Sequence, residues 1–149
     1  MPVKPVPEGY HAVTPYLIVP GVARLIDFLK EAFDAIEGER MQTPDGRIMH
    51  AEVTIGDSRI MMGEPKAQWV PMPASLHLYV NDIETTYRRS IEAGASTVME
   101  PGDQFYGDRS AGIKDPSGNI WWIATHVEDV APDEMKRHAE AQFKTSSGA

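Results

Sequence analysis

The feature that most constrains the fold is an internal repeat, because the chain can be laid on itself with a constant shift of 61 residues. Apolar strand positions then coincide, since Leu17 falls on Leu78, and turn residues coincide, since Gly46 falls on Gly107. Few residues are identical, but strands, helix and turns match without a gap. Segments that share one pattern are expected to share one supersecondary structure. The repeat therefore predicts two similar modules, with a generic α+β domain as the alternative.

Each copy predicts the order strand, helix, strand, strand, strand. The elements of the first copy are expected at 15–19, 22–36, 41–43, 48–55 and 59–62. Those of the second are expected at 75–80, 83–93 and 98–99, followed by a loop at 101–106 and a hairpin over 107–126. The first helix rests on Leu25, Ile26, Leu29 and Phe33, which recur at the spacing of one buried helix face. This apolar stripe is interpreted as core.

The hairpin of the second copy is the clearest local signal. The run from Asp115 to Asn119 is rich in turn residues, because Pro116 restricts φ and Gly118 accepts positive φ. The strand that follows carries Trp121 and Trp122 in succession. Successive side chains of a strand point to opposite faces. One indole is therefore expected in the core and the other in a cavity or in solvent.

Proline and glycine divide the rest of the chain. Pro2, Pro5 and Pro7 oppose a helix near the N-terminus, and prolines recur between the two copies. Pro132 suits the first turn of a C-terminal helix, expected to run to about residue 143 with 145–149 frayed. The expected segments are an extended arm at 1–13, a first βαβββ module at 14–64, a linker at 65–74, a second module at 75–126, and a C-terminal helix and tail at 127–149.

Composition excludes several classes of function. With 22 acidic against 14 basic residues the formal net charge is -8, which argues against nucleic acid and anionic membranes as partners. No apolar run approaches a membrane span, and residues 1–5 lack the apolar stretch of a signal peptide, so a cytoplasmic protein is expected. The absence of cysteine excludes disulfides, thiol catalysis and cysteine-bound metals.

The motifs carry a family resemblance. Gly107-Asp108-Arg109, the later run from Asp115 to Trp121, and the opening run from Glu8 to Leu17 resemble the glyoxalase/bleomycin-resistance/extradiol-dioxygenase (vicinal oxygen chelate) superfamily, in particular its PhnB-like branch. The likeness covers residues 5 to about 137, with departures at Leu29 and Asp34, where an aromatic residue and glycine are usual. It implies an α+β fold whose tandem βαβββ modules form a curved mixed sheet around a cavity. It also implies a homodimer, but not one particular reaction.

The resemblance also implies where a metal would bind. In metal-using members the ligands come from the first and last strands of each module, which places them at Thr14, Met61, Ser75 and Trp122. Hydroxyls are weak ligands and a thioether suits soft metals, so no divalent metal and no cofactor are expected. A register slip of one residue would exchange the faces of a strand and bring Glu52 or His77 into play.

Strand alternation predicts what lines the cavity. Met49, Ala51, Val53 and Ile55 are expected to face the helices, which leaves Ile48, His50, Glu52 and Thr54 on the other face. With the positions implied by the resemblance, the expected ligand-binding residues are Tyr16, His50, Glu52, Arg59, Met61, Ser75, His77, Tyr79 and Trp122, with Ile120 also facing inward. Aromatic walls with a few polar groups are typical of small-molecule sites.

Each polar candidate has a plainer interpretation. His50 and Glu52 are equally consistent with a solvated sheet face, and His77 with a hydrogen-bonded core histidine. Arg109 is interpreted as a structural donor at the hairpin rather than a substrate clamp. The residues after the last strand, His126, Glu128 and Asp129, are interpreted as surface or interface groups.

Two classes of function follow. The first is a drug-sequestering type of binding protein, which holds a planar ligand by stacking on Trp122, Tyr16 and Tyr79. The second is an enzyme of the vicinal oxygen chelate superfamily. It would be a metal-free lyase or isomerase with His50, Glu52 or His77 as acid and base, or a metal-dependent lyase or dioxygenase with shifted ligands.

Overall fold

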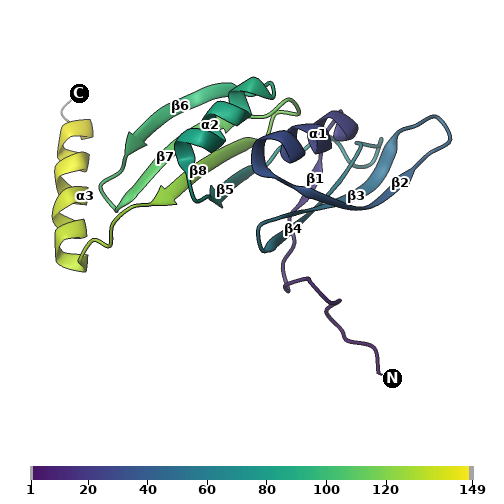
Figure 1. Cartoon of the computed structure of the whole chain (residues 1–149), viewed down its shortest axis with the longest axis horizontal. Coiled ribbons are helices and arrows are strands. Elements are labelled where there is room, and N and C mark those ends of the chain that lie inside the picture. The colour runs from purple at the N-terminus through teal and green to yellow at the C-terminus, as the bar shows by residue number, and fades with distance from the viewer. Residues whose placement is uncertain (1, 148–149) are drawn as a thin grey trace.

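The computed structural model describes residues 2–147. The first module contains β1 (Tyr16–Ile18), α1 (Val22–Phe33), β2 (Ile36–Gln42), β3 (Ile48–Ile55) and β4 (Ser58–Gly63). The second contains β5 (Ser75–Tyr79), α2 (Ile83–Glu92), β6 (Ser96–Asp103), β7 (Asp108–Lys114) and β8 (Ile120–His126), and α3 (Pro132–Ser147) follows it. Figure 1 shows the two modules side by side with α1 next to α2, and α3 beyond the second module.

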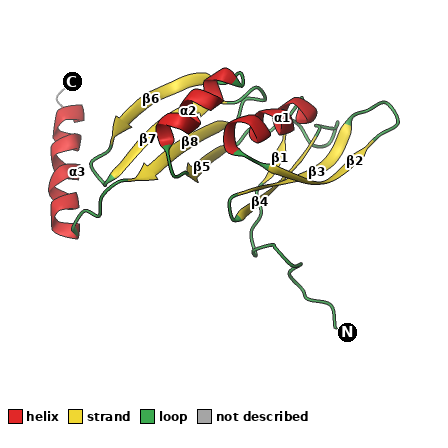
Figure 2. Cartoon of the chain, in the orientation of Figure 1, coloured by secondary structure: helices red, strands yellow, loops and turns green. Residues whose placement is uncertain are grey.

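Each module has a mixed four-stranded sheet of its own. The strand orders are β1-β4-β3-β2 and β5-β8-β7-β6, in which the first strand of each module pairs in parallel with its last strand. The other pairs are antiparallel. Figure 2 shows α1 and α2 each lying over the sheet of its own module. The predicted α+β fold with tandem βαβββ modules is therefore confirmed.

The register of the strands supports the repeat and corrects it at one strand. Tyr16 pairs with Met61 and His77 pairs with Trp122, so the parallel pairs keep the shift of 61 residues. In the antiparallel pairs, however, Glu52 lies opposite Met61 while Gly112 lies opposite Trp122, which places β7 one residue out of step. The cause is the turn between β7 and β8, which holds one residue more than the turn between β3 and β4. The expectation of a match without a gap was wrong here.

The core is built mainly on α1. Its buried residues are Val22, Leu25, Ile26, Phe28, Leu29, Ala32 and Phe33, whereas α2 buries only Ile83, Thr86 and Ser90. Phe33 extends this core into the second module, because its ring packs against the ring of Trp121 with centroids 5.0 Å apart. Burial of apolar surface is the main favourable contribution to folding. The interpretation of the α1 stripe as core is confirmed.

The first helix ends earlier than predicted. Asp34 adopts φ 56°, in the left-handed region, and this conformation terminates α1 after Phe33. Ile36 consequently starts β2 and is 71% exposed, although it fits the helical spacing. The expected short strand at 41–43 is the end of this longer strand. Apolar spacing alone did not reveal the break, because aspartate enters the left-handed region less often than glycine.

Three further elements differ from expectation. Of the loop expected at 101–106, residues 101–103 belong to β6, an edge strand, where proline is tolerated next to a break in register. An irregularity in the pairing of β2 with β3 turns Ile48 into the core, at 2% exposure, instead of the sheet face away from the helices. The C-terminal helix reaches Ser147 rather than ending near 143, and of the tail expected to fray, residues 148–149 lie outside the described part. No helix within residues 2–147 is long and apolar enough to cross a membrane.

Candidate functional site

The two consecutive tryptophans of β8 lie on opposite faces of the second sheet, as predicted. Trp121 is 1% exposed, and its indole N–H donates to Asp115 Oδ2 over 2.8 Å in the core. Trp122 lies on the other face, where its Nε1 donates to Ser75 Oγ over 2.9 Å. The second sheet thus has a face not covered by its helix, which we call the open face. On it the ring of Trp122 is tied to β5.

A glycine makes room for this ring. Gly112 lies opposite Trp122 on β7, and a Cβ atom at this position would lie only 2.7 Å from Cζ3 of the indole. Real Cβ contacts are essentially never that close. Sequence reasoning did not select Gly112, although an isolated glycine within a strand is a recognised sign of close approach by another group. The ring of Trp122 is therefore positioned over the backbone of β7.

A polar network occupies one end of the open face. Asp108, at the start of β7, is only 2% exposed. Its Oδ2 accepts the hydroxyl of Tyr79 over 2.8 Å, and its Oδ1 lies 2.8 Å from Nδ1 of His126. The other ring nitrogen of His126 lies 2.7 Å from Oδ1 of Asp129. Sequence reasoning treated Tyr79 as a ligand-binding residue, Asp108 as part of a motif, and His126 and Asp129 as surface or interface groups, and so missed the network.

The network shifts the titration of its members. Burial alone would raise the pKa of Asp108, but the hydrogen bonds with His126 and Tyr79 outweigh it and lower the pKa below its usual value. Hydrogen bonds to Asp129 and Asp108 raise the pKa of His126. The bond to Asp108, followed by burial, raises the pKa of the Tyr79 phenol. The network is thus stabilised with Asp108 ionised, His126 protonated and Tyr79 neutral.

The first sheet presents a different set of groups on its corresponding face. Tyr16 and His50 lie close together, with 3.2 Å between the phenol oxygen and Nδ1 and 5.7 Å between ring centroids. Glu52 lies opposite Met61, which in turn pairs with Tyr16. Oε2 of Glu52 is buried and has no hydrogen-bond partner within the described residues. Burial raises the pKa of Tyr16.

The two arginines considered from sequence have structural contacts. Arg59 donates from Nε to the carbonyl of Gly9 over 3.1 Å, and its guanidinium lies 4.6 Å from the ring centroid of Tyr10. It therefore holds the N-terminal arm. Arg109 pairs with Glu84 of α2 and with Asp103, on the face of β7 away from Trp122. This supports its interpretation as a structural donor.

The predicted ligand-binding residues form two groups rather than one. Tyr16, His50, Glu52, Arg59 and Met61 lie on the first sheet, and Ser75, His77, Tyr79 and Trp122 lie on the second. Within the described residues, no hydrogen bond or ring contact joins a member of one group to a member of the other. On the second sheet His77 and Tyr79 do contact each other, with ring centroids 4.7 Å apart. One chain thus provides two partial sites, which share only a small cavity of about 200 Å³ bordered by Arg59 and His77.

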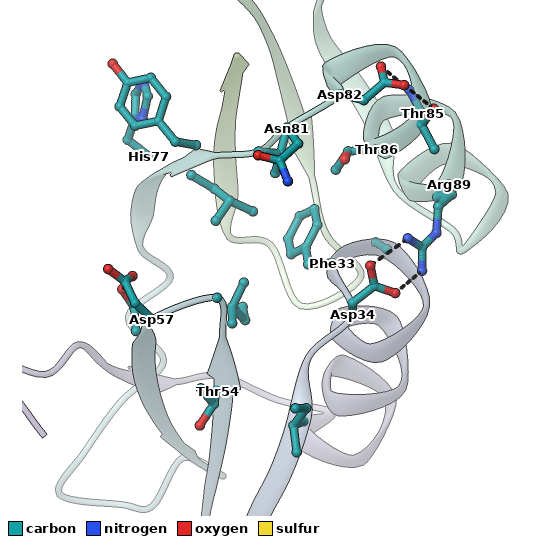
Figure 3. A pocket seen from close by; sticks show the side chains of 18 residues that line it. Phe33, Asp34, Thr54, Asp57, His77, Asn81, Asp82, Thr85, Thr86 and Arg89 are labelled. Atoms are coloured by element: carbon teal, nitrogen blue, oxygen red, sulfur yellow. Dashed lines mark hydrogen bonds and ion pairs between the residues drawn. The ribbon is translucent and has the colours of Figure 1, made fainter. Parts of the chain in front are cut away.

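A cavity of about 830 Å³ lies between the modules and borders the second group. Figure 3 shows His77 and Asn81 on one side of it and Asp34 and Arg89 on the other. The carboxylate of Asp34 accepts two hydrogen bonds from Arg89, at 2.7 and 3.0 Å. This pair lowers the pKa of Asp34 and raises that of Arg89. It connects the end of α1 with α2, and so links the two modules.

The family model described as Glyoxalase/Bleomycin resistance protein/Dioxygenase superfamily matches residues 10–123. The chain belongs to this superfamily. A protein of Mycobacterium bovis described as uncharacterised is 32% identical over 142 residues, covering 88% of this chain and 93% of that protein. Solved structures with the same fold include TioX from Micromonospora sp. ML1, with 21% identity and a TM-score of 0.64 over 81% of this chain and 100% of TioX. A PhnB protein from Bacillus cereus has 18% identity and a TM-score of 0.62, over 77% and 99% of the two chains.

The positions that hold a metal in metal-using members of the superfamily do not fit a divalent cation here. The hydroxyl of Ser75 already accepts a hydrogen bond from the indole N–H of Trp122. The indole nitrogen is only a donor, so Trp122 has no lone pair to offer a metal. Met61 supplies a thioether, and Thr14 a weakly coordinating hydroxyl. Elsewhere in residues 2–147 no group of three or more His, Asp or Glu side chains is placed to hold a metal ion. The residues at the family position therefore do not form a site for a divalent metal.

Proposed function

We propose that this protein binds a planar aromatic small molecule on the open face of the second sheet, and that it does so without a divalent metal. The observation that carries the proposal is the placement of Trp122. Its ring lies over Gly112 and is tied to Ser75, so an indole face is positioned at the place where metal-using relatives coordinate. A ring held in this way stacks on a planar ligand with little further loss of conformational freedom.

The second half of the site is proposed to come from another copy of the chain. Within one chain the two partial sites share only the small cavity at Arg59 and His77, and both leave aromatic side chains exposed, including Tyr16 and Tyr79. A twofold dimer that places the first sheet of one protomer over the second sheet of its partner would join all nine predicted ligand-binding residues in two equivalent cavities. Light scattering should then give twice the mass of the 16.5 kDa chain.

Assignment to the PhnB-like branch is part of the same proposal. It is supported by the fold shared with the PhnB protein of Bacillus cereus and by the motifs near Asp108 and Asp115. Action in the cytoplasm is also part of this proposal, since a chain without cysteine folds without disulfides and needs no oxidising compartment.

A binding role agrees better with the geometry than a catalytic one. Of the three acid–base candidates, His50 contacts Tyr16 and His77 contacts Tyr79. Within the described residues no hydrogen bond joins His50, Glu52 and His77 to one another. General acid–base catalysis needs such groups within reach of the same reacting atoms.

The direct test is the binding of acridine, an uncharged planar probe in mildly alkaline buffer, followed by fluorescence titration. Replacing Trp122 with alanine should weaken acridine binding by on the order of 1 to 3 kcal/mol, because it removes a large apolar contact surface. Trp69→Ala is the matched control, since Trp69 is an exposed tryptophan of the linker between the modules. A chelator should leave wild-type binding unchanged. A stoichiometric metal held by His50, Glu52 or His77, with binding lost on chelation, would contradict the proposal.

A further inference from the structure

The buried carboxylate of Asp108 determines the direction of a hydrogen bond on the open face. An ionised carboxylate only accepts, so the hydroxyl hydrogen of Tyr79 must point at Oδ2 of Asp108 over the 2.8 Å contact. Asp108 is 2% exposed and shares its other oxygen with His126, so water has little access to compete for it. The phenol hydrogen is therefore directed into the protein.

His126 supports the charge on Asp108 from the other side. Its two ring nitrogens each face a carboxylate oxygen, Nδ1 at 2.8 Å from Asp108 and Nε2 at 2.7 Å from Asp129. Both nitrogens can donate only when the imidazole is protonated. A cation beside the buried carboxylate stabilises its ionised form. The polar network thus keeps Asp108 an acceptor toward Tyr79.

The phenol oxygen of Tyr79 can still form one more hydrogen bond, on its exposed side. The side chain lies on the open face and is 61% exposed, in ring contact with His77, which pairs with Trp122 on the neighbouring strand. Because its hydrogen is used, the phenol oxygen can only accept a further hydrogen bond. The indole N–H of Trp122 is likewise used, by Ser75. At the Tyr79 end the face therefore offers an acceptor to a ligand.

Ser110 adds an adaptable group beside it. It lies on β7 between Asp108 and Gly112, on the same face, and is 4% exposed. Its hydroxyl makes no hydrogen bond within the described residues. A serine hydroxyl can donate or accept. Ser110 therefore offers a polar contact that suits donor and acceptor ligands alike, so by itself it does not discriminate between them.

We propose that Asp108 is a positioning residue for specificity, which makes Tyr79 a hydrogen-bond acceptor and so selects planar ligands that carry an N–H or O–H donor. This inference rests on the proposed function, since it assumes that ligands stack on Trp122. Its chemical basis is that a polar group left without a partner costs more free energy than a hydrogen bond contributes. A ligand that presents only an acceptor to Tyr79 places its own lone pair against the phenol oxygen, so neither atom gains a hydrogen bond. Polar groups left unpaired beneath a bound ligand are unfavourable.

Two uncharged planar probes test the preference. Carbazole has a ring N–H that donates, whereas acridine in mildly alkaline buffer has a ring nitrogen that only accepts. Wild-type protein should bind carbazole about 3- to 10-fold more tightly than acridine, the ratio that one net hydrogen bond supplies. The measured quantity is the ratio of the two dissociation constants. A variant that is partly unfolded would bind both probes more weakly and would leave this ratio unchanged.

Asp108→Asn should reverse the ratio. With its amide oxygen toward His126, the asparagine would turn its NH₂ group toward Tyr79 and donate to the phenol oxygen. The hydroxyl hydrogen would then be free to point outward and to favour acridine. Tyr79→Phe should bring the ratio close to one, and it provides a test even if Asp108→Asn does not fold. His126→Gln should keep the preference for carbazole, because the glutamine amide can still donate to Oδ1 of Asp108 and leaves the carboxylate an acceptor toward Tyr79.

The outcomes separate this inference from the proposed function. If both probes bind in a manner that depends on Trp122 but with equal affinity in wild-type protein, the inference is wrong and the binding function stands. An unchanged ratio in Tyr79→Phe would overturn it in the same way. If neither probe binds, or if Trp122→Ala binds both as wild type does, the proposed function fails and the inference fails with it.

Discussion

The open face of the second sheet and the corresponding face of the first sheet differ in their chemistry. At the same place in the two modules, Glu52 lies opposite Met61 and Gly112 lies opposite Trp122. The large indole of Trp122 lies opposite a glycine, which has no side chain. The narrower side chain of Met61 lies opposite the carboxylate of Glu52. Side chains directly across a sheet share one space, so the pair rather than the single residue is the unit that varies. Only the second pair creates an aromatic surface.

The polar groups of the two faces also differ in how well they are satisfied. On the second sheet the hydrogens of Trp122 and Tyr79 are both donated within the protein. On the first sheet Oε2 of Glu52 is buried without a partner in the described residues. A buried unpaired oxygen is costly, and it requires a partner from elsewhere. The second sheet is thus prepared for stacking, while the first offers an acceptor that a ligand or a second chain would satisfy.

The largest expected effect concerns the core that joins the modules. Trp121→Ala should lower the free energy of unfolding by about 3–5 kcal/mol, because it empties a large buried site and removes the packing on Phe33. Its counterpart in the first module is Ile60, which is 5% exposed. Ile60→Ala should cost less, since it removes fewer buried atoms. Urea denaturation of both variants measures the difference, and equal losses would show that Trp121 has no special part in joining the modules.

A smaller effect is expected at Gly112. Gly112→Ala places a methyl group against the indole of Trp122 and should cost about 1–3 kcal/mol of stability while weakening acridine binding. Gly102→Ala on β6 is the control, because the nearest atom to its added Cβ is the Glu100 carbonyl oxygen at 4.0 Å. Urea denaturation and probe titration are measured together. If Gly112→Ala and Gly102→Ala behave alike, the pairing of Gly112 with Trp122 does not position the ring.

The ion pair between the modules should contribute less. A double-mutant cycle with Asp34→Ala and Arg89→Ala should give a coupling energy of about 0–1 kcal/mol, since the Asp34 side chain is 78% exposed and salt screens it. The exposed pair Arg88 and Glu92, within α2, provides a comparison with no link between modules. Coupling that persists in high salt would indicate that the pair is more shielded than its exposure implies.

The smallest effect is a pH dependence specific to the second module. The pKa of His126 is raised in the folded state, so its contribution to stability is present below the unfolded value and is lost as pH rises through the folded value. The difference between wild type and His126→Gln in urea midpoint should therefore shrink between about pH 6 and pH 8.5. Over this range Asp108 stays ionised, because its pKa is lowered. A difference that grows with pH would contradict the assigned network.

The sequence by itself determined the repeat, the order of elements and the opposite faces of Trp121 and Trp122. These features depend on local rules, namely the periodicity of apolar residues and the backbone preferences of proline and glycine. The span of β3, at Ile48–Ile55, was predicted without error for the same reason. The family resemblance rested on these local motifs and is confirmed at the level of the superfamily.

Other features were decided only by the tertiary structure. The one-residue offset of β7 depends on how two strands close a turn, and the early end of α1 depends on a left-handed aspartate that also pairs with Arg89. The network around Asp108 joins β5, β7 and β8, with Tyr79 29 residues away in the chain. Periodicity assigns a side chain to a face but does not identify its partner across the sheet. Hydrogen-bond direction, and with it the proposed ligand preference, follows only from those long-range contacts.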